Sequence, residues 1–146
     1  MIASQTSVSI ERAIDQVFAY VSDPRNLPHW NSAVQAVHPT PQAPNGDGST
    51  YSMERQLPNG RATNEIEILA CEPPRTFAIR TTTGPTPFIY RYHFAADNGA
   101  TVVRLDAQVN LPAPAALLPQ LARHGVKKGV DDNLATLKLI LEQQRP

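Results

Sequence analysis

Cysteine, charge of one sign and long hydrophobic runs are all scarce in this sequence, and each scarcity excludes a class of protein. Cys71 is the only cysteine among 146 residues, which excludes an internal disulfide and a site built from several thiolates. Lys and Arg number 13, as do Asp and Glu, which argues against nucleic acid as the main partner. The sequence shows neither a secretory signal nor a run of membrane-spanning length, so we expect a cytoplasmic protein without membrane insertion.

The common enzyme motifs are missing as well. The sequence has no glycine-rich phosphate loop, dinucleotide fingerprint, HExxH pair or nucleophile elbow. Its histidines fall in different segments, with no spacing that indicates a metal site: His29, His38, His93 and His124. We therefore expect neither a metal nor another cofactor, and the sequence identifies no catalytic residue.

A long segment near the C-terminus predicts the dominant helix, over residues 114–144. Pro119 suits a first helical turn, where its missing amide costs nothing. Spacings of three and four predict one buried stripe, made of Leu118, Ala122, Gly125, Val126, Gly129, Asn133, Leu137 and Ile140. Large residues close both ends of this stripe and small residues fill its middle. A curved sheet packed against such a helix is expected to enclose a hollow.

Alternating residues predict strands over 4–10, 34–37, 50–57, 61–71, 76–82, 88–95 and 101–110. Two short helices are expected over 13–21 and 25–30, separated by Ser22-Asp23-Pro24, where Asp23 is placed to cap the second. Loops rich in Pro and Gly are expected at 39–48, 58–60 and 84–87, and a hairpin turn at 97–99. We predict a single α+β domain over 1–146, with antiparallel strands and the helices on one side.

This order of elements resembles the START-like or helix-grip superfamily (SRPBCC), in its polyketide cyclase/dehydrase-like branch. The matching parts are residues 10–24, Trp30, Glu72-Pro73-Pro74-Arg75, the hairpin over 90–101 and the helix end at 134–142. The resemblance implies a curved antiparallel β-sheet wrapped around a long C-terminal α-helix, with two short helices after the first strand. It also implies that hydrophobic small molecules bind between the sheet and the helix.

Thirteen residues are candidates for lining that space. Seven come from strand faces, five from the helical stripe, and one closes the second short helix: Tyr51, Met53, Arg55, Asn64, Ile66, Tyr90, Tyr92, Ala122, Val126, Gly129, Asn133, Leu137 and Trp30. Tyr90 and Tyr92 offer apolar walls with hydroxyl tips, or are ordinary core aromatics. Asn133 either bonds a ligand carbonyl or satisfies backbone or water.

The charged candidates each have two interpretations. A buried Arg55 could stabilise an enolate during a cyclase-type reaction, or it could be solvated at the cavity mouth. Glu65 and Glu67 share a strand face, where they could act as a carboxylate pair or simply form the solvated side of the sheet. His124 and Lys128 are one helical turn apart. They could provide a general base beside the cavity, or they could form a solvated edge of the helix.

Three functions follow from the sequence and its resemblance. The leading one is binding of a small hydrophobic ligand, lipid-like or aromatic and polyketide-like. The alternatives are a polyketide cyclase or dehydratase that acts in the same cavity, and a protein-interaction module of the chaperone co-activator type. We expect a monomer or a weak homodimer.

Overall fold

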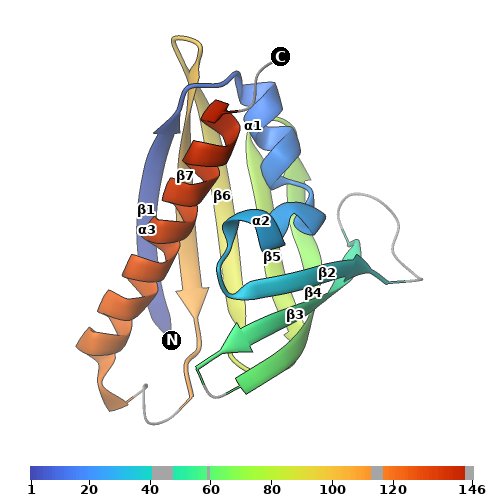
Figure 1. Ribbon diagram of the computed structural model, residues 1–146, viewed down its shortest axis with the longest axis vertical. Coiled ribbons are helices and arrows are strands. Elements are labelled where there is room, and N and C mark those ends of the chain that lie inside the picture. Colours follow the sequence, from blue (N-terminus) through green and yellow to red (C-terminus); the bar gives the residue numbers. More distant parts are fainter. Residues whose placement is uncertain (41–47, 59, 113–116, 144–146) are drawn as a thin grey trace.

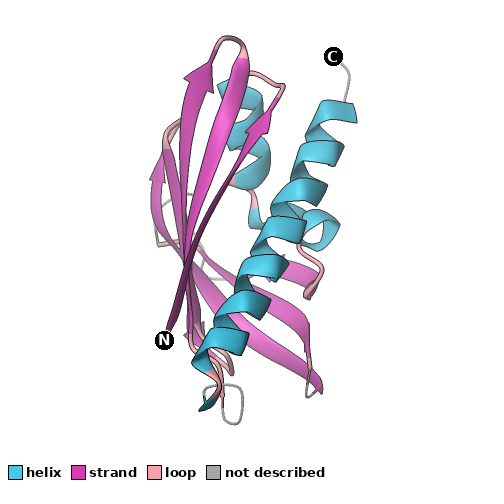
Figure 2. Cartoon of the chain, turned by 90° about the vertical axis from the view of Figure 1, so that its left-hand side faces the viewer, coloured by secondary structure: helices cyan, strands magenta, loops and turns pink. Residues whose placement is uncertain are grey.

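A seven-stranded antiparallel sheet carries the helices of this protein on one face (Figures 1 and 2). The structure, a computed structural model, describes residues 1–40, 48–58, 60–112 and 117–143. The expected loop at 39–48, the turn at 58–60 and both ends of the helix expected over 114–144 therefore lie partly outside the described residues. The elements in chain order are β1 (Ile2–Ile10), α1 (Ile14–Val21), a 3-10 turn (Pro24–Asn26), α2 (Leu27–Trp30), β2 (Val34–Pro39), β3 (Thr50–Leu57), β4 (Gly60–Glu72), β5 (Thr76–Thr83), β6 (Phe88–Asp97), β7 (Ala100–Val109) and α3 (Pro119–Gln143).

The strands are arranged in the order β1-β7-β6-β5-β4-β3-β2, and every neighbouring pair is antiparallel. Short turns connect most consecutive strands. The β6–β7 hairpin turns through Asn98 and Gly99, whose φ angles of 51° and 85° suit a tight hairpin turn. The α+β fold with a curved antiparallel sheet and a long C-terminal helix, predicted from the sequence, is confirmed.

The short helices after β1 differ in detail from the expected pair. Asp23 does cap the second segment, because its carboxylate accepts a hydrogen bond from the Arg25 amide at 3.0 Å. The segment expected as one helix over 25–30 is instead a 3-10 turn followed by the four-residue α2. Trp30 at the end of α2 is buried and lies edge-on to Tyr92, with ring centroids 6.1 Å apart.

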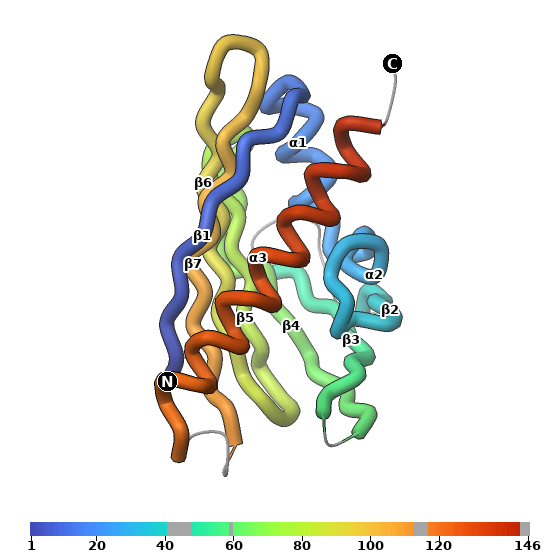
Figure 3. Tube along the Cα trace, turned by 60° about the vertical axis from the view of Figure 1, so that its left-hand side comes forward, coloured from blue at the N-terminus to red at the C-terminus, as the bar shows by residue number. Residues whose placement is uncertain are grey.

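The long helix α3 begins at Pro119, which suits a first helical turn, and runs alongside β1 (Figure 3). Its C-terminal half packs tightly, and the residues it buries are Val130, Leu134, Leu137 and Leu141. Its N-terminal half is largely exposed, and the expected buried stripe does not extend there. Leu118 precedes the helix and is 58% exposed, while Gly125 and Gly129 are exposed on α3. The stripe is therefore closed by large residues at one end only, and the hollow beneath it opens to solvent.

The filled part of the core lies under α1 and the C-terminal half of α3. Phe18 of α1 packs edge-on against Phe94 of β6, with ring centroids 5.1 Å apart. The residues just before α3 and the first turn of that helix carry exposed leucines instead: Leu117, Leu118 and Leu121. Among the described residues, no helix combines the length and the hydropathy needed to cross a membrane.

Candidate functional site

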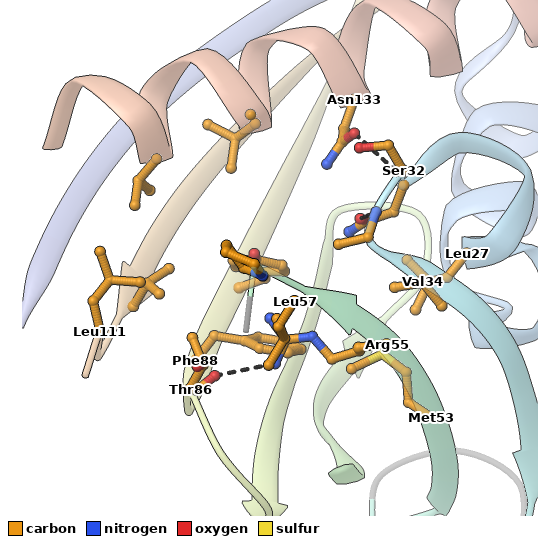
Figure 4. A pocket seen from close by; sticks show the side chains of 18 of the residues that line it. Leu27, Ser32, Val34, Met53, Arg55, Leu57, Thr86, Phe88, Leu111 and Asn133 are labelled. Carbon is orange, nitrogen blue, oxygen red and sulfur yellow. Dashed lines mark hydrogen bonds between the residues drawn. The ribbon is translucent and has the colours of Figure 1, made fainter. Parts of the chain in front are cut away.

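A cavity of about 370 Å³ lies between the sheet and the N-terminal half of α3 (Figure 4). The helix creates it because Gly129, on the side that meets the cavity, has no side chain to fill the space. Val126, one turn earlier, is only half-buried. The opposite wall comes from β3, β5, β6 and β7, and one side is closed by α2 and the loop that follows it.

Apolar side chains form most of the cavity wall. They come from every element around it: Leu27, Val34, Met53, Leu57, Ile79, Phe88, Val109, Leu111, Val126 and Val130. Phe88 and Tyr90 stack with ring centroids 4.3 Å apart and an angle of 24° between their planes. This pair gives one wall a flat aromatic surface of the kind that ring-shaped or extended apolar molecules contact.

One charged side chain, that of Arg55, reaches this apolar cavity (Figure 4). It is only 7% exposed, and its guanidinium lies 5.1 Å from the centroid of the Phe88 ring. Its Nη1 donates hydrogen bonds of 3.1 Å to Asn64 Oδ1 and to the Thr86 carbonyl. Burial lowers the pKa of Arg55 from its ordinary value, and the nearby Tyr90 partly opposes that shift. No ion pair of the described residues includes Arg55.

Asn64 positions Arg55 from behind the cavity wall. Its side chain is fully buried, and its Nδ2 donates 2.9 Å hydrogen bonds to the carbonyls of Thr83 and Pro85. Its Oδ1 is left to accept from the arginine. Both N–H donors and the oxygen of the amide side chain therefore fasten Arg55 and the turn between β5 and β6 together.

Two further amide side chains lie at the side of the cavity nearest α2. Asn133 of α3 accepts a 3.2 Å hydrogen bond from the Ser32 amide through Oδ1, and its nitrogen turns away from Ser32 toward the cavity (Figure 4). Asn31 is 8% exposed and accepts a 3.1 Å hydrogen bond from the Ala33 amide through Oδ1. Both oxygens are thus used within the protein, and the side-chain N–H groups remain.

Tyr90 contributes a phenol to the cavity, which the hydroxyl-bearing residues Ser32 and Thr86 also line. Burial raises the pKa of its phenol above the ordinary value of 10.0, although Arg55 opposes the shift. The hydroxyl is therefore protonated at neutral pH and can donate a hydrogen bond.

The structure places the predicted lining residues in two groups. Those that line the cavity are Met53, Arg55, Tyr90, Val126, Gly129 and Asn133. Those that do not are Trp30, Tyr51, Asn64, Ile66, Tyr92, Ala122 and Leu137. Within the second group, Trp30, Ile66, Tyr92 and Leu137 belong to the filled core. Asn64 supports Arg55, and Tyr51 and Ala122 are half-buried elsewhere.

The other charged candidates lie outside the cavity. Glu67 is paired with Arg80 at 2.8 Å on the sheet surface, and Glu65 is exposed. Lys128 is paired with Asp132 at 2.8 Å along α3, and His124 is exposed. No group of three or more His, Cys, Asp or Glu side chains in the described residues is placed to hold a metal ion.

Sequence reasoning missed the loop that closes one side of the cavity and several wall residues. The missed residues include Asn31, Ser32, Ala33, Val34, Thr86, Leu111 and Pro112. The loop carries no periodic pattern, so no signal placed it there. Phe88 was also missed, but a signal for it was present, because the alternation of its strand places it on the same face as Tyr90.

Comparison with known proteins identifies a family whose sequence profile matches most of this chain. A sequence profile of the family described as "Polyketide cyclase / dehydrase and lipid transport" matches residues 1–142. A search of functionally curated proteins found no match.

Solved structures with the same fold cover almost the whole chain. TTHA0849 from Thermus thermophilus is 15% identical with a TM-score of 0.78, and the match covers 94% of each chain. A START superfamily protein from Mycobacterium smegmatis is 14% identical with a TM-score of 0.73, over 97% of each chain. The di-domain ARO/CYC protein StfQ of the steffimycin biosynthetic pathway is 15% identical with a TM-score of 0.76. That match covers 97% of this chain and 51% of StfQ.

Proposed function

The chain belongs to the polyketide cyclase/dehydrase and lipid transport family, and we propose that it binds a small hydrophobic molecule, lipid-like or aromatic and polyketide-like, between the sheet and α3. The observation that carries this proposal is the cavity itself. A volume of about 370 Å³ with mainly apolar walls is within the range of small-molecule sites. Burial of apolar ligand surface supplies most of the binding free energy, at about 25 cal/mol per Å².

The geometry of α3 provides a direct test. Gly129 lines the cavity, whereas Gly125, one turn earlier, does not. A Cβ atom at either position would meet nothing within 4 Å, so both sites accept a larger side chain. Each replacement also removes a glycine from a helix, which stabilises that helix by about 1 kcal/mol. The two variants therefore differ mainly in whether the new side chain occupies the cavity.

We expect the Gly129→Leu variant to bind the neutral fluorescent probe N-phenyl-1-naphthylamine at least about tenfold more weakly than the wild type, because its leucine occupies the ligand's space. The matched Gly125→Leu variant should bind as the wild type does. Fluorescence titration of the three proteins measures both affinities. Equal binding by all three would show that the probe, and the proposed function, do not use this cavity.

A cyclase or dehydratase is the second candidate, and the proximity of Arg55 to Tyr90 favours it. Both side chains line the cavity, where the guanidinium stabilises a developing enolate and the neutral phenol donates a hydrogen bond to a departing oxygen. Native mass spectrometry of the protein purified from its own host separates the two candidates. A retained ligand whose mass is unchanged on incubation supports binding, whereas loss of water from it during incubation supports dehydration.

A further inference from the structure

The cavity has an unbalanced charge. Among the described residues that line it, Arg55 is present but no Asp or Glu, and the one other ionisable side chain is the neutral phenol of Tyr90. A buried charge costs several kcal/mol unless a partner of opposite sign and hydrogen bonds compensate for it. The hydrogen bonds to Asn64 and to the Thr86 carbonyl compensate only in part, because neither acceptor carries a charge.

The hydrogen-bonding groups around the cavity are unbalanced in the same direction. Arg55 uses only Nη1 within the described residues, which leaves Nε and Nη2 as unused donors. The Oδ1 atoms of Asn31 and Asn133 already accept backbone hydrogen bonds, and their Nδ2 groups make none within the described residues. The wall also carries the hydroxyls of Ser32, Thr86 and Tyr90, each of which can donate or accept. The remaining N–H groups therefore leave donors in excess, and donors require acceptors.

From this one-sided supply of charge and donors, we propose that the natural ligand is an anion, with an apolar body and one oxyanion group, a carboxylate or an enolate, that binds Arg55. The inference rests on the proposed function, because it assigns a chemical class to the ligand of the same cavity. The apolar body lies against the Phe88 and Tyr90 rings, and the oxyanion accepts from Arg55.

A purely structural role for Arg55 is the competing explanation, because its bonds to Asn64 and Thr86 also fasten the turn between β5 and β6. A pair of matched probes separates the two. N-Phenyl-1-naphthylamine is neutral, and 8-anilinonaphthalene-1-sulfonate has the same rings with an added sulfonate. The ratio of their affinities reports the preference for an anion, and a change in folding alone affects both probes.

We expect the wild type to bind the sulfonate at least about tenfold more tightly than the neutral probe. Arg55→Met should weaken binding of the sulfonate probe by about 10- to 100-fold, because it removes a charged hydrogen bond. It should weaken binding of the neutral probe by less than about threefold. Arg55→Lys should retain part of the preference, since it keeps the charge but not the planar set of donors.

Asn133→Asp gives a second test that leaves Arg55 in place. The aspartate still accepts from the Ser32 amide, but it replaces the N–H donor toward the cavity with a negative charge. We expect sulfonate affinity to fall at least about tenfold, with little change for the neutral probe. Gln120→Glu, which adds the same charge at an exposed position of α3 outside the cavity, is the control and should affect neither probe.

The outcomes distinguish this inference from the proposed function. If neither probe binds the wild type, or Gly129→Leu weakens neither, the proposed function fails. If the neutral probe binds in the cavity but the sulfonate has no advantage, the anion inference is overturned while the proposed function stands. The anion inference is also overturned if the Asn133→Asp variant still binds the sulfonate more tightly than the neutral probe by the wild-type ratio. This variant decides the question if Arg55→Met does not fold.

Discussion

The contact between Asn64 and the turn from β5 to β6 determines where the Arg55 guanidinium lies. Gly84, the first residue of that turn, has a φ angle of 95°, which residues other than glycine rarely adopt. A Cβ atom there would lie 2.5 Å from the Thr63 carbonyl oxygen and 2.6 Å from Asn64 Nδ2. Gly84 therefore allows the turn to approach Asn64 closely enough for the hydrogen bonds that support Arg55.

Replacing Gly84 with alanine should destabilise the protein by roughly 1–3 kcal/mol from backbone strain alone, with a further cost from the clash. Gly99→Ala is the matched control, since its φ of 85° is equally strained while a Cβ there meets nothing within 4 Å. Urea denaturation followed by circular dichroism gives both free energies of unfolding. Equal losses in the two variants would contradict the close approach to Asn64.

Predictions at the residue scale succeeded in assigning strand faces and failed in locating residues along them. The alternation in β6 placed Tyr90 and Tyr92 on one face, and both do face the helices. Tyr92 is 1% exposed beneath Trp30, whereas Tyr90 lines the cavity. The difference arises because α2 covers one part of the strand and not the next, a tertiary contact that periodicity does not encode.

At the scale of elements, α3 consists of two halves with different surroundings. The sequence predicted the burial of Leu137, which is correct, and the burial of Leu118, which is wrong. Spacing alone identifies residues that share one side of a helix. It does not show how far the sheet extends beneath that side, and here the N-terminal half lies over the open cavity.

The two halves of α3 should exchange amide hydrogens at different rates. Residues 130–141 anchor one half through buried side chains, while residues 119–129 include no fully buried side chain. Local opening is easier where few apolar contacts must be broken. Hydrogen-exchange mass spectrometry should therefore find faster exchange in 119–129. Uniform protection along α3 would contradict this division of the helix.

Glu142 fastens the C-terminal end of α3 to the residue that follows β1. Its carboxylate accepts from Lys138 at 2.7 Å and from the Glu11 amide at 2.9 Å. The lysine, and secondarily that amide, lower the pKa of Glu142 from its ordinary value of 4.5. A carboxyl with a lowered pKa in the folded state contributes stability above its unfolded pKa and loses it as the pH falls through the folded pKa.

The Glu142→Gln variant should therefore be less stable than the wild type at pH 7, by about 1 kcal/mol or less for so exposed a pair. The difference should vanish as the pH falls below about 4.5, because the wild type then loses the same interaction. Denaturation curves at several pH values measure it. Glu65→Gln, at an exposed glutamate without an ion pair among the described residues, should leave stability unchanged at every pH.

At the scale of the whole molecule, the same sheet supports a filled core at one end and a cavity at the other. The order of strands and helices along the chain predicted the fold, because short turns between alternating segments leave few ways to pair the strands. The position of the cavity along α3 could not be predicted in the same way. It depends on α2 and its loop, which close one side, and on the reach of the sheet beneath the helix.

The division of the molecule into a filled core and a cavity predicts which variants a ligand should stabilise. A ligand that binds only the folded state at 100 times its dissociation constant raises the free energy of unfolding by about 2.7 kcal/mol. We expect 8-anilinonaphthalene-1-sulfonate to do so in the wild type and in Gly125→Leu, but not in Gly129→Leu, as measured by circular dichroism in urea.

Hydrogen exchange in the presence of the probe then tests the location. Slower exchange is expected in residues 27–34 and 126–133, which contain the cavity-lining residues of α2, its loop and α3, while α1 in the filled core should not change. The ligand supplies the apolar contacts that the N-terminal half of α3 lacks, so that half should gain the most protection. Stabilisation that persists in Gly129→Leu, or protection confined to α1, would place the binding site outside the cavity.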